Sequence, residues 1–173
     1  LTQKLKLNHL TESDKNIASL ALGGCQYGVT TTESAAAYAI FGNQGVYHKP
    51  TTYYKIERAN GEVIFDYDET GTQVISPASA TIMNHLLQEV VYGSEGTGGG
   101  IAGYNYKMKA YAKKGTSSES KDLWMVAGTP YYVGSVWYGF DIQSEVGAGG
   151  NAAKIWKAVM SEVHKELEKK EFA

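Results

Sequence analysis

Three strand-like runs with short connections, within residues 106–141, constrain the fold of this chain more than any other feature. The runs are Tyr106 to Thr116, Leu123 to Ala127 and Tyr132 to Tyr138. The third is apolar on both faces, as a central strand would be. The connection Gly128-Thr129-Pro130 is too short for a crossover, so the last two runs are predicted to be antiparallel neighbours.

Capping signals predict helices before and after these strands. Thr30 and Glu33 have the spacing of a capping box, so a helix begins here and ends at Asn43-Gln44-Gly45, within a helical part spanning 1–50. Ser76-Pro77 predicts a second helix over 76–93, and a third is predicted over 151–169. The faces expected to be buried carry apolar residues at helical spacing: Ala80, Met83, Leu87, Val90 and Val91 in the second helix, and Ala152, Ile155, Trp156, Val159 and Val163 in the third.

A β-hairpin is predicted over 51–68, where side chains of alternating character flank Asn60-Gly61. This dipeptide favours a two-residue turn because both positions tolerate positive φ. A glycine-rich loop over 94–103 separates the second helix from the strands. The order of elements predicts an α/β fold of the α+β type, in which helices flank an antiparallel sheet.

Composition excludes several classes of protein. The 173 residues are 43% hydrophobic, enough for the core of one domain, and a net charge of -2 argues against a nucleic-acid partner. Cys25 is the only cysteine, so neither an internal disulfide nor a zinc cluster is expected, and the four histidines lack ligand spacing. We therefore expect no metal and no cofactor. The sequence begins at Leu1 rather than methionine, which predicts a piece of a longer protein.

The run Lys113-Lys114-Gly115-Thr116 carries the clearest chemistry. A lysine supplies a fixed positive charge, a glycine lets a ligand backbone approach the strand, and a threonine offers a hydroxyl and an N–H. An acyl substrate with a free carboxylate would fit these groups. Taken alone, the same four residues are also typical of a solvated turn, so the interpretation depends on the rest of the chain.

Several short motifs resemble, in order, the C-terminal portion of the transpeptidase domain of class A, bifunctional penicillin-binding proteins. The resemblance covers nearly the whole chain, 1–173, and rests on Ala21-Leu22-Gly23-Gly24, Gly28-Val29-Thr30, Glu33, Ala35, Ala37-Tyr38, Asn43-Gln44-Gly45, Gly96-Thr97-Gly98, Lys113-x-Gly115-Thr116, Asp122-x-Trp124, Gly128-Thr129-Pro130 and Val136-Trp137-Tyr138-Gly139-x-Asp141. It implies a fold like that of penicillin-binding transpeptidases and β-lactamases.

The resemblance implies a serine acyl-transferase, a D,D-transpeptidase that crosslinks peptidoglycan stem peptides ending in D-alanyl-D-alanine and is acylated by β-lactams. Lys113 and Thr116 match the family's catalytic positions, and the Thr116 N–H would form half of an oxyanion hole. The substrate-binding positions it implies are Lys114, Gly115, Thr116 and Ser117.

Two departures from the family pattern make the site unusual. Lys114 stands where the family has a hydroxyl, and its side chain has three alternatives: an electrostatic contact with the carboxylate, a direction away from the cleft, or crowding of the cleft. The nucleophile motif Ser-x-x-Lys belongs upstream of everything found here. Ser118-Glu119-Ser120-Lys121 spells it in the wrong place and is interpreted as a solvated turn, so this chain alone is expected to be inactive.

The resemblance also implies a location and a partner segment. We expect the protein at the extracytoplasmic face of the bacterial membrane, anchored by an upstream segment, and a glycosyltransferase domain before it. The apolar run Tyr132 to Tyr138 would be an uncovered sheet edge in this chain, which predicts that the upstream segment covers it. The alternative function is a non-catalytic module that binds or senses β-lactam or peptidoglycan.

Overall fold

The computed structural model describes residues 3–5, 7–105, 108–147 and 149–172. Its centre is an antiparallel sheet of β5 (Tyr111–Thr116), β6 (Asp122–Gly128) and β7 (Val133–Gly139), in the order β5-β6-β7. The antiparallel pairing predicted for the last two runs is confirmed. The first predicted strand started at Tyr106, which lies outside the described residues, and β5 itself begins at Tyr111.

The edge position predicted for the third run in this chain is confirmed within the described residues. β7 pairs with β6 on one side and with no described strand on the other, so it is an edge rather than the centre of this sheet. Both faces of β7 are nevertheless contacted by helices, residues 31–39 on one side and 151–163 on the other, which fits its apolar residues. The other edge of the sheet is β5.

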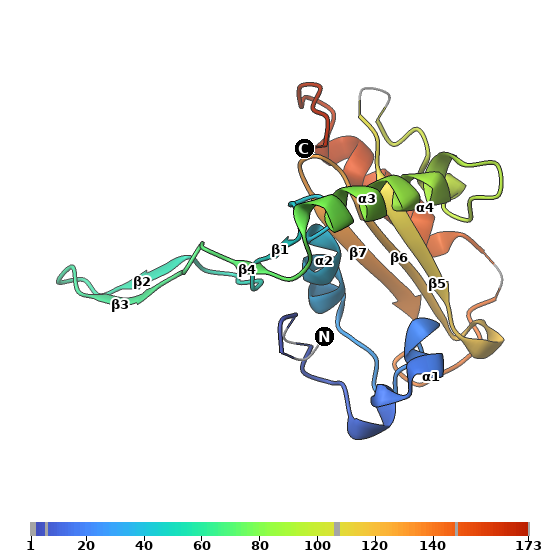
Figure 1. Ribbon diagram of the computed structural model, residues 1–173, viewed down its shortest axis with the longest axis horizontal. Coiled ribbons are helices and arrows are strands. Elements are labelled where there is room, and N and C mark those ends of the chain that lie inside the picture. The colour runs from blue at the N-terminus through green and yellow to red at the C-terminus, as the bar shows by residue number, and fades with distance from the viewer. Residues whose placement is uncertain (1–2, 6, 106–107, 148, 173) are drawn as a thin grey trace.

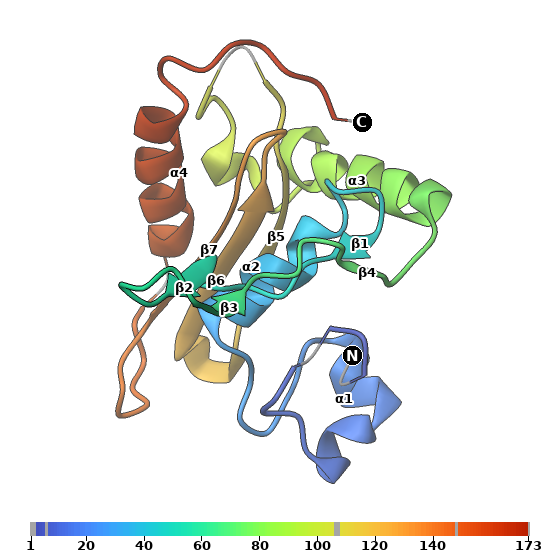
Figure 2. The same cartoon turned by 90° about the vertical axis from the view of Figure 1, so that its left-hand side faces the viewer.

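Two helices lie on opposite faces of the sheet, α2 (Thr31–Ala39) on one and α4 (Asn151–Val163) on the other (Figure 1, Figure 2). The main core lies under α4, where Trp156 is 1% exposed and packs with side chains of β5 and β6. The buried residues on this face are Ala110, Ala112, Leu123, Met125, Ala127, Ala152, Ala153, Trp156 and Met160.

The buried face predicted for α4 is only partly correct. Ala152 and Trp156 are buried, but Ile155, Val159 and Val163 are 42%, 53% and 47% exposed. The buried stripe instead includes Ala153 and Met160. The exposed residues Ile155, Val159 and Val163 form a second apolar stripe of α4, which faces away from the sheet. The helix also ends at Val163, where the prediction extended it to 169.

α3 (Pro77–Tyr92) begins as predicted, with the Ser76 hydroxyl accepting from the Ser79 N–H and proline at the first turn. Its predicted face is wrong at Met83, which is exposed, while Asn84 and Gln88 are buried. The two amides are satisfied, because Asn84 Nδ2 donates to the Phe41 carbonyl (3.0 Å) and Gln88 Nε2 donates to Asn84 Oδ1 (2.6 Å). Two polar residues therefore belong to the buried face of α3, at positions outside the apolar stripe predicted from periodicity.

The N-terminal part is less helical than predicted. It contains the short helices η1 (Glu12–Lys15) and α1 (Ile17–Ala21) before α2, whose capping box at Thr30 is confirmed. α2 ends at Ala39, several residues before the predicted end. A two-residue strand, β1 (Val46–Tyr47), follows and pairs with β4 (Thr72–Gln73).

The hairpin of β2 (Lys55–Glu57) and β3 (Val63–Asp66) forms an arm that extends away from the body of the molecule (Figure 1). Its turn differs from the prediction. In the turn only Gly61 has positive φ (+85°), and the Arg58 N–H donates to the Glu62 carbonyl. The loop therefore contains three residues, with glycine at the left-handed position. The glycine-rich segment holds the short helix η2 (Gly99–Ile101), and η3 (Ser118–Ser120) lies between β5 and β6.

Candidate functional site

The candidate site residues lie on β5, a free edge of the described sheet, and in the turn that follows it. Side chains alternate between the two faces of a strand. Lys113 pairs with Val126 and Gly115 with Trp124, on the face toward α2. Lys114 pairs with Met125 and Thr116 with Leu123, on the face toward α4. The strand thus divides the four-residue motif into two pairs.

Tyr111 fixes the beginning of β5 against α2. Its ring is fully buried, and its hydroxyl donates to the Tyr38 carbonyl at 2.8 Å. Burial raises the pKa of the Tyr111 phenol well above its ordinary value. The opposite residue in β6 is Gly128, where a Cβ would overlap Cζ and Oη of the Tyr111 ring. Gly128 is therefore needed because it leaves space for the ring of Tyr111. Tyr111 lies two residues before Lys113 on the same strand.

Lys113 and Lys114 are both exposed, and neither forms an ion pair with any residue that the structure describes. Lys113 Nζ donates to the carbonyl of Lys114 at 2.9 Å. Two ammonium groups, one on each face of β5 and neither with a carboxylate partner among the described residues, leave a local excess of positive charge at the sheet edge. Such an edge favours an anionic ligand.

Thr116 is exposed at the end of β5, whereas the Ser117 hydroxyl is engaged in the turn. Ser117 Oγ donates to Asp122 Oδ2 (2.9 Å) and accepts from the Asp122 N–H (2.8 Å). Trp137 Nε1 donates to the other carboxylate oxygen of Asp122 at 2.8 Å. These bonds tie the start of β6 to both neighbouring strands and hold the turn next to Thr116 in place.

The turn contains the Ser118-Glu119-Ser120-Lys121 sequence. Ser118 is exposed, and Lys121 forms an ion pair with Glu119 at 2.6 Å. Glu119 and Ser120 have positive φ, so they form the tight turn rather than a helix that could present a serine to a lysine. Their geometry agrees with the prediction of a solvated turn.

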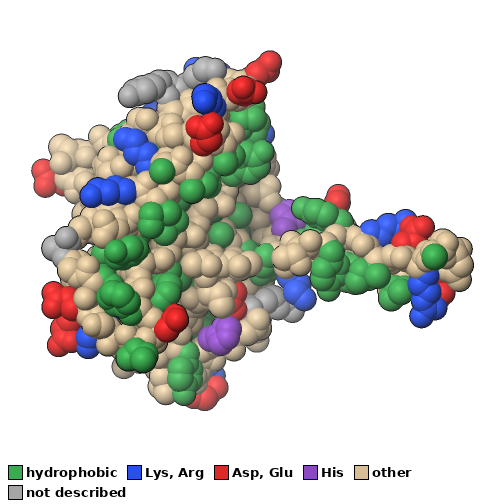
Figure 3. Space-filling view, turned by 180° about the vertical axis from the view of Figure 1, so that it is seen from behind, with side chains coloured by type: hydrophobic (Ala, Val, Ile, Leu, Met, Phe, Trp, Pro, Cys, Tyr) green, Lys and Arg blue, Asp and Glu red, His purple; other side chains and the backbone are tan. Residues whose placement is uncertain are grey.

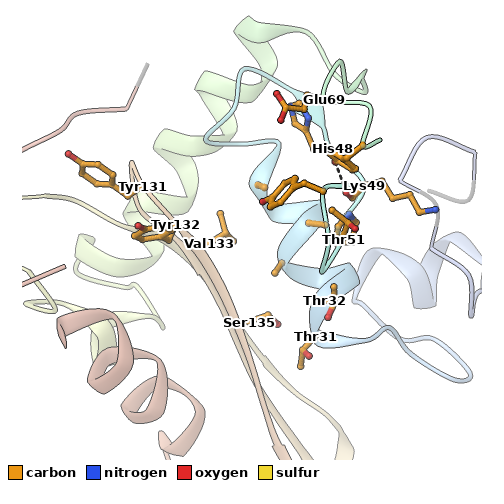
Figure 4. A pocket seen from close by; sticks show the side chains of 16 residues that line it. Thr31, Thr32, His48, Lys49, Thr51, Glu69, Tyr131, Tyr132, Val133 and Ser135 are labelled. Carbon is orange, nitrogen blue, oxygen red and sulfur yellow. Dashed lines mark hydrogen bonds between the residues drawn. The ribbon is translucent and has the colours of Figure 1, made fainter. Parts of the chain in front are cut away.

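A cavity of about 810 Å³ lies elsewhere, between α2, the root of the arm and β7 (Figure 4). Thr31 and Thr32 of α2 face Val133 and Ser135 of β7 across it, and residues 113–117 are outside its lining. The Oγ atom of Ser135 is buried there without a hydrogen-bond partner in the described part of the chain. The cavity is an open groove next to the free edge of β7.

The carboxylate of Glu33 joins α2 to the N-terminal segment. It accepts hydrogen bonds from the Asn8 N–H (3.0 Å) and the Thr30 N–H (2.9 Å), and His9 lies 3.4 Å away. Burial raises the pKa of Glu33, but the hydrogen bonds lower it more, so the net shift is downward. Glu33 therefore acts structurally, as an anchor for the chain that enters α2.

His164 is a buried polar residue that sequence patterns missed. Its Nδ1 donates to the Met160 carbonyl (2.8 Å), and its Nε2 lies 2.8 Å from the Thr129 hydroxyl. The rings of Tyr104, Tyr131 and Tyr132 surround it. The signal available in the sequence was Thr129, a hydroxyl in the short β6–β7 connection that requires a partner once buried.

In residues 3–5, 7–105, 108–147 and 149–172, no three His, Cys, Asp or Glu side chains come together in a way that could hold a metal ion. Over the same residues, none of the helices has the length and apolar character needed to cross a membrane.

Comparison with known proteins identifies the family. Residues 3–161 match the model of the penicillin binding protein transpeptidase domain, and the chain belongs to this family. Penicillin-binding protein 1A of Clostridium acetobutylicum is 40% identical over 159 residues, which cover 91% of this chain and 19% of the relative. Penicillin-binding protein 1F of Bacillus subtilis is 35% identical over 138 residues, 79% of this chain and 19% of that protein.

A solved structure agrees with this relationship. PonA1 from Mycobacterium tuberculosis superposes with a TM-score of 0.76 at 30% identity, covering 94% of this chain and 45% of the solved one. The resemblance to class A penicillin-binding proteins and the predicted fold, helices with an antiparallel sheet, are thereby confirmed. The chain spans about a fifth of the length of the curated relatives.

Proposed function

We propose that this chain forms one wall of the active site of a D,D-transpeptidase, an enzyme that crosslinks peptidoglycan stem peptides and is acylated by β-lactams. The observation that carries the proposal is the free edge of β5, where Lys113, Gly115 and Thr116 stand exposed or half-buried beside unpaired positive charge. Lys113 would hold the proton network, and Thr116 would offer its hydroxyl and N–H to the acyl group. Ser117 borders the same edge.

The proposed nucleophile lies in an upstream segment that completes the domain. Within the described residues, three surfaces without a packing partner support such a segment: the free edge of β7, the groove between α2 and β7, and the outer stripe of α4 formed by Ile155, Val159 and Val163. Figure 3 shows hydrophobic side chains across the middle of the rear face, on the α4 side of the sheet. Exposed apolar surface next to an open strand edge favours burial against further protein.

The relatives support the ligand class and the location that we propose. PonA1 has also been solved in complex with penicillin V, at 29% identity to this chain. A protein that crosslinks peptidoglycan works outside the cytoplasmic membrane, so we place this chain there, anchored by sequence upstream of Leu1. Stem peptides ending in D-alanyl-D-alanine are the proposed substrates, and β-lactams are the proposed inhibitors.

Two measurements test the proposal. The gene should encode Ser-x-x-Lys followed by Ser-x-Asn upstream of Leu1, and the protein with that sequence should be labelled covalently by a fluorescent penicillin. Lys113→Met should abolish labelling, because it removes the ammonium group without shortening the side chain much. Lys121→Met is the matched control, since Lys121 is paired with Glu119 in the turn, and it should label normally. A gene without the upstream motifs would support the non-catalytic binding module instead.

A further inference from the structure

We propose that Phe172 is a positioning residue for the reaction, at the end of a strap that holds the beginning of β5 and, through it, Lys113. The strap is the segment 165–172, which follows α4 and passes over one end of the sheet (Figure 2). This inference rests on the proposed function, because it concerns the strand that carries the candidate site. The strap itself belongs to neither core cluster.

The sequence of the strap indicates which of its residues can anchor it. Six of the seven residues in 165–171 are charged, and a segment of this composition does not order by itself. Phe172 is the one aromatic residue of the strap, and its ring is half-buried. The attachment of this charged segment to the rest of the molecule therefore depends on the ring and on a few local bonds.

Local bonds lead the strap across the sheet. Asn105 Nδ2 donates to the carbonyl of His164, where the strap begins, at 3.1 Å. Tyr131 Oη donates to the Glu168 carbonyl at 3.2 Å, and Lys170 Nζ lies 4.9 Å from the centre of the Tyr131 ring. Tyr131 belongs to the connection between β6 and β7. The strap is therefore fastened to the same sheet that it crosses.

The strap ends on the ring of Tyr111. The centres of the Phe172 and Tyr111 rings are 5.4 Å apart, a distance at which aromatic pairs attract one another. Phe41 of the segment after α2 approaches the Tyr111 ring edge-on, with the ring centres 6.5 Å apart. Tyr111 is 0% exposed. The Phe172 ring therefore forms part of the cover that keeps water away from Tyr111.

Charge adds a weaker attraction at the same place. A hydrogen bond and the positive charge of Lys169 lower the pKa of the Glu171 carboxylate, and the charge of Lys109 lowers it further. Lys109 lies two residues before the start of β5. Because these groups are exposed, solvent screens their attraction, and the aromatic contact of Phe172 holds the strap more strongly.

Tyr111 connects the strap to the candidate site. It is the first residue of β5, and Tyr111, Lys113 and Gly115 share the face toward α2, because alternate side chains of a strand point the same way. β5 pairs with β6 on one side and with no described strand on the other, so fewer bonds hold it than hold a central strand. A fixed ring at Tyr111 therefore limits the movement of Lys113, about 7 Å further along the strand.

Hydrogen exchange tests the strap in the protein that includes the upstream sequence. In Phe172→Ala, the backbone amides of residues 108–116 should exchange about five- to tenfold faster, because loss of the aromatic pair makes local opening of β5 easier. The amides of α4 should change less than about twofold. Phe172→Tyr, which keeps the ring, should exchange as the unmodified protein does. Glu166→Ala is the matched control, since Glu166 is exposed elsewhere in the strap, and it should have no effect.

Acylation by a fluorescent penicillin tests the connection to Lys113. At saturating penicillin, Phe172→Ala should lower the rate constant of acylation about three- to tenfold, because a small displacement of a group at the reacting centre slows the reaction. The final labelled fraction should stay the same, and Phe172→Tyr should restore the rate. A lower labelled fraction at an unchanged rate would mean that part of the protein is misfolded, and it would overturn the inference.

The exchange data can also overturn the inference. Unchanged exchange over 108–116 in Phe172→Ala would show that the strap does not hold β5, and equally faster exchange throughout the chain would show a general loss of stability. Faster exchange over 108–116 with unchanged acylation would refute the connection to Lys113. If the unmodified protein takes no label at all, the proposed function fails and the role in the reaction with it, whereas the exchange experiment still decides whether the strap holds β5.

Discussion

The Tyr111–Gly128 contact sets the position of β5, and replacing Gly128 with alanine is the sharpest test of that role. The new Cβ would overlap Cζ and Oη of the Tyr111 ring and lie 2.6 Å from Cε1, where ordinary carbon contacts are about 3.5 to 4.0 Å. The ring has little room to retreat, because its hydroxyl bonds to Tyr38 and its plane packs near Phe41 and Phe172.

The expected cost can be worked from these contacts. Overpacking a buried site typically costs about 1–3 kcal/mol. Displacing the ring also breaks the Tyr111–Tyr38 hydrogen bond, worth about 1 kcal/mol. We therefore expect Gly128→Ala to lower the free energy of unfolding by about 2–4 kcal/mol. Urea denaturation followed by tryptophan fluorescence, to which the buried Trp156 contributes, measures this change.

Two variants separate the clash from a general effect of alanine. Gly150→Ala is the control, because a Cβ there meets nothing within 4 Å, and its cost should stay below about 0.5 kcal/mol. In a Tyr111→Leu background the bulky ring is absent, so Gly128→Ala should cost less than about 1 kcal/mol. An equal cost of Gly128→Ala in both backgrounds would refute the argument that the ring requires glycine.

Two further predictions concern hydrogen-bonded carboxylates. Because the pKa of Glu33 is lowered in the fold, its carboxylate stabilises the protein above the unfolded pKa of about 4.3, and the contribution is lost as pH falls through the lowered value. Glu33→Gln should therefore lower the melting temperature at pH 7, and the two proteins should converge in acid; a constant difference at every pH would contradict this. Ser117→Ala and Asp122→Ala should each cost about 1–2 kcal/mol and should be non-additive, since they remove one network. Urea denaturation of the double variant checks this, and simple additivity would exclude a shared network.

The sequence predicted those elements whose signals are local. The capping side chains Thr30 and Ser76 contact backbone only three residues away, so their helix starts follow from neighbours in the chain. The antiparallel meander followed from the short Gly128-Thr129-Pro130 connection. The turn at Asn60-Gly61 was placed correctly but given the wrong length. The dipeptide suits a two-residue turn and also a three-residue loop that ends in glycine, so it does not determine the length of the loop.

Burial was harder to predict, because it depends on what each helix meets. Asn84 is buried in α3 since the Phe41 carbonyl from a distant segment needs a donor there. Val159 is exposed in α4 since the described sheet reaches only the other side of the helix. The site motif itself was placed on the correct strand, but which face of the sheet Lys113 and Lys114 each occupy emerged only with the register and the packing of the helices.

The arm formed by β2 and β3 offers a practical handle on this protein. Its tip, at Ala59, Asn60 and Gly61, is exposed and belongs to neither core cluster. Exposed loop tips tolerate inserted sequence better than packed segments do. A peptide tag or a fluorophore placed at the tip would report the position of the whole domain in a cell while leaving β5 and its charged edge undisturbed.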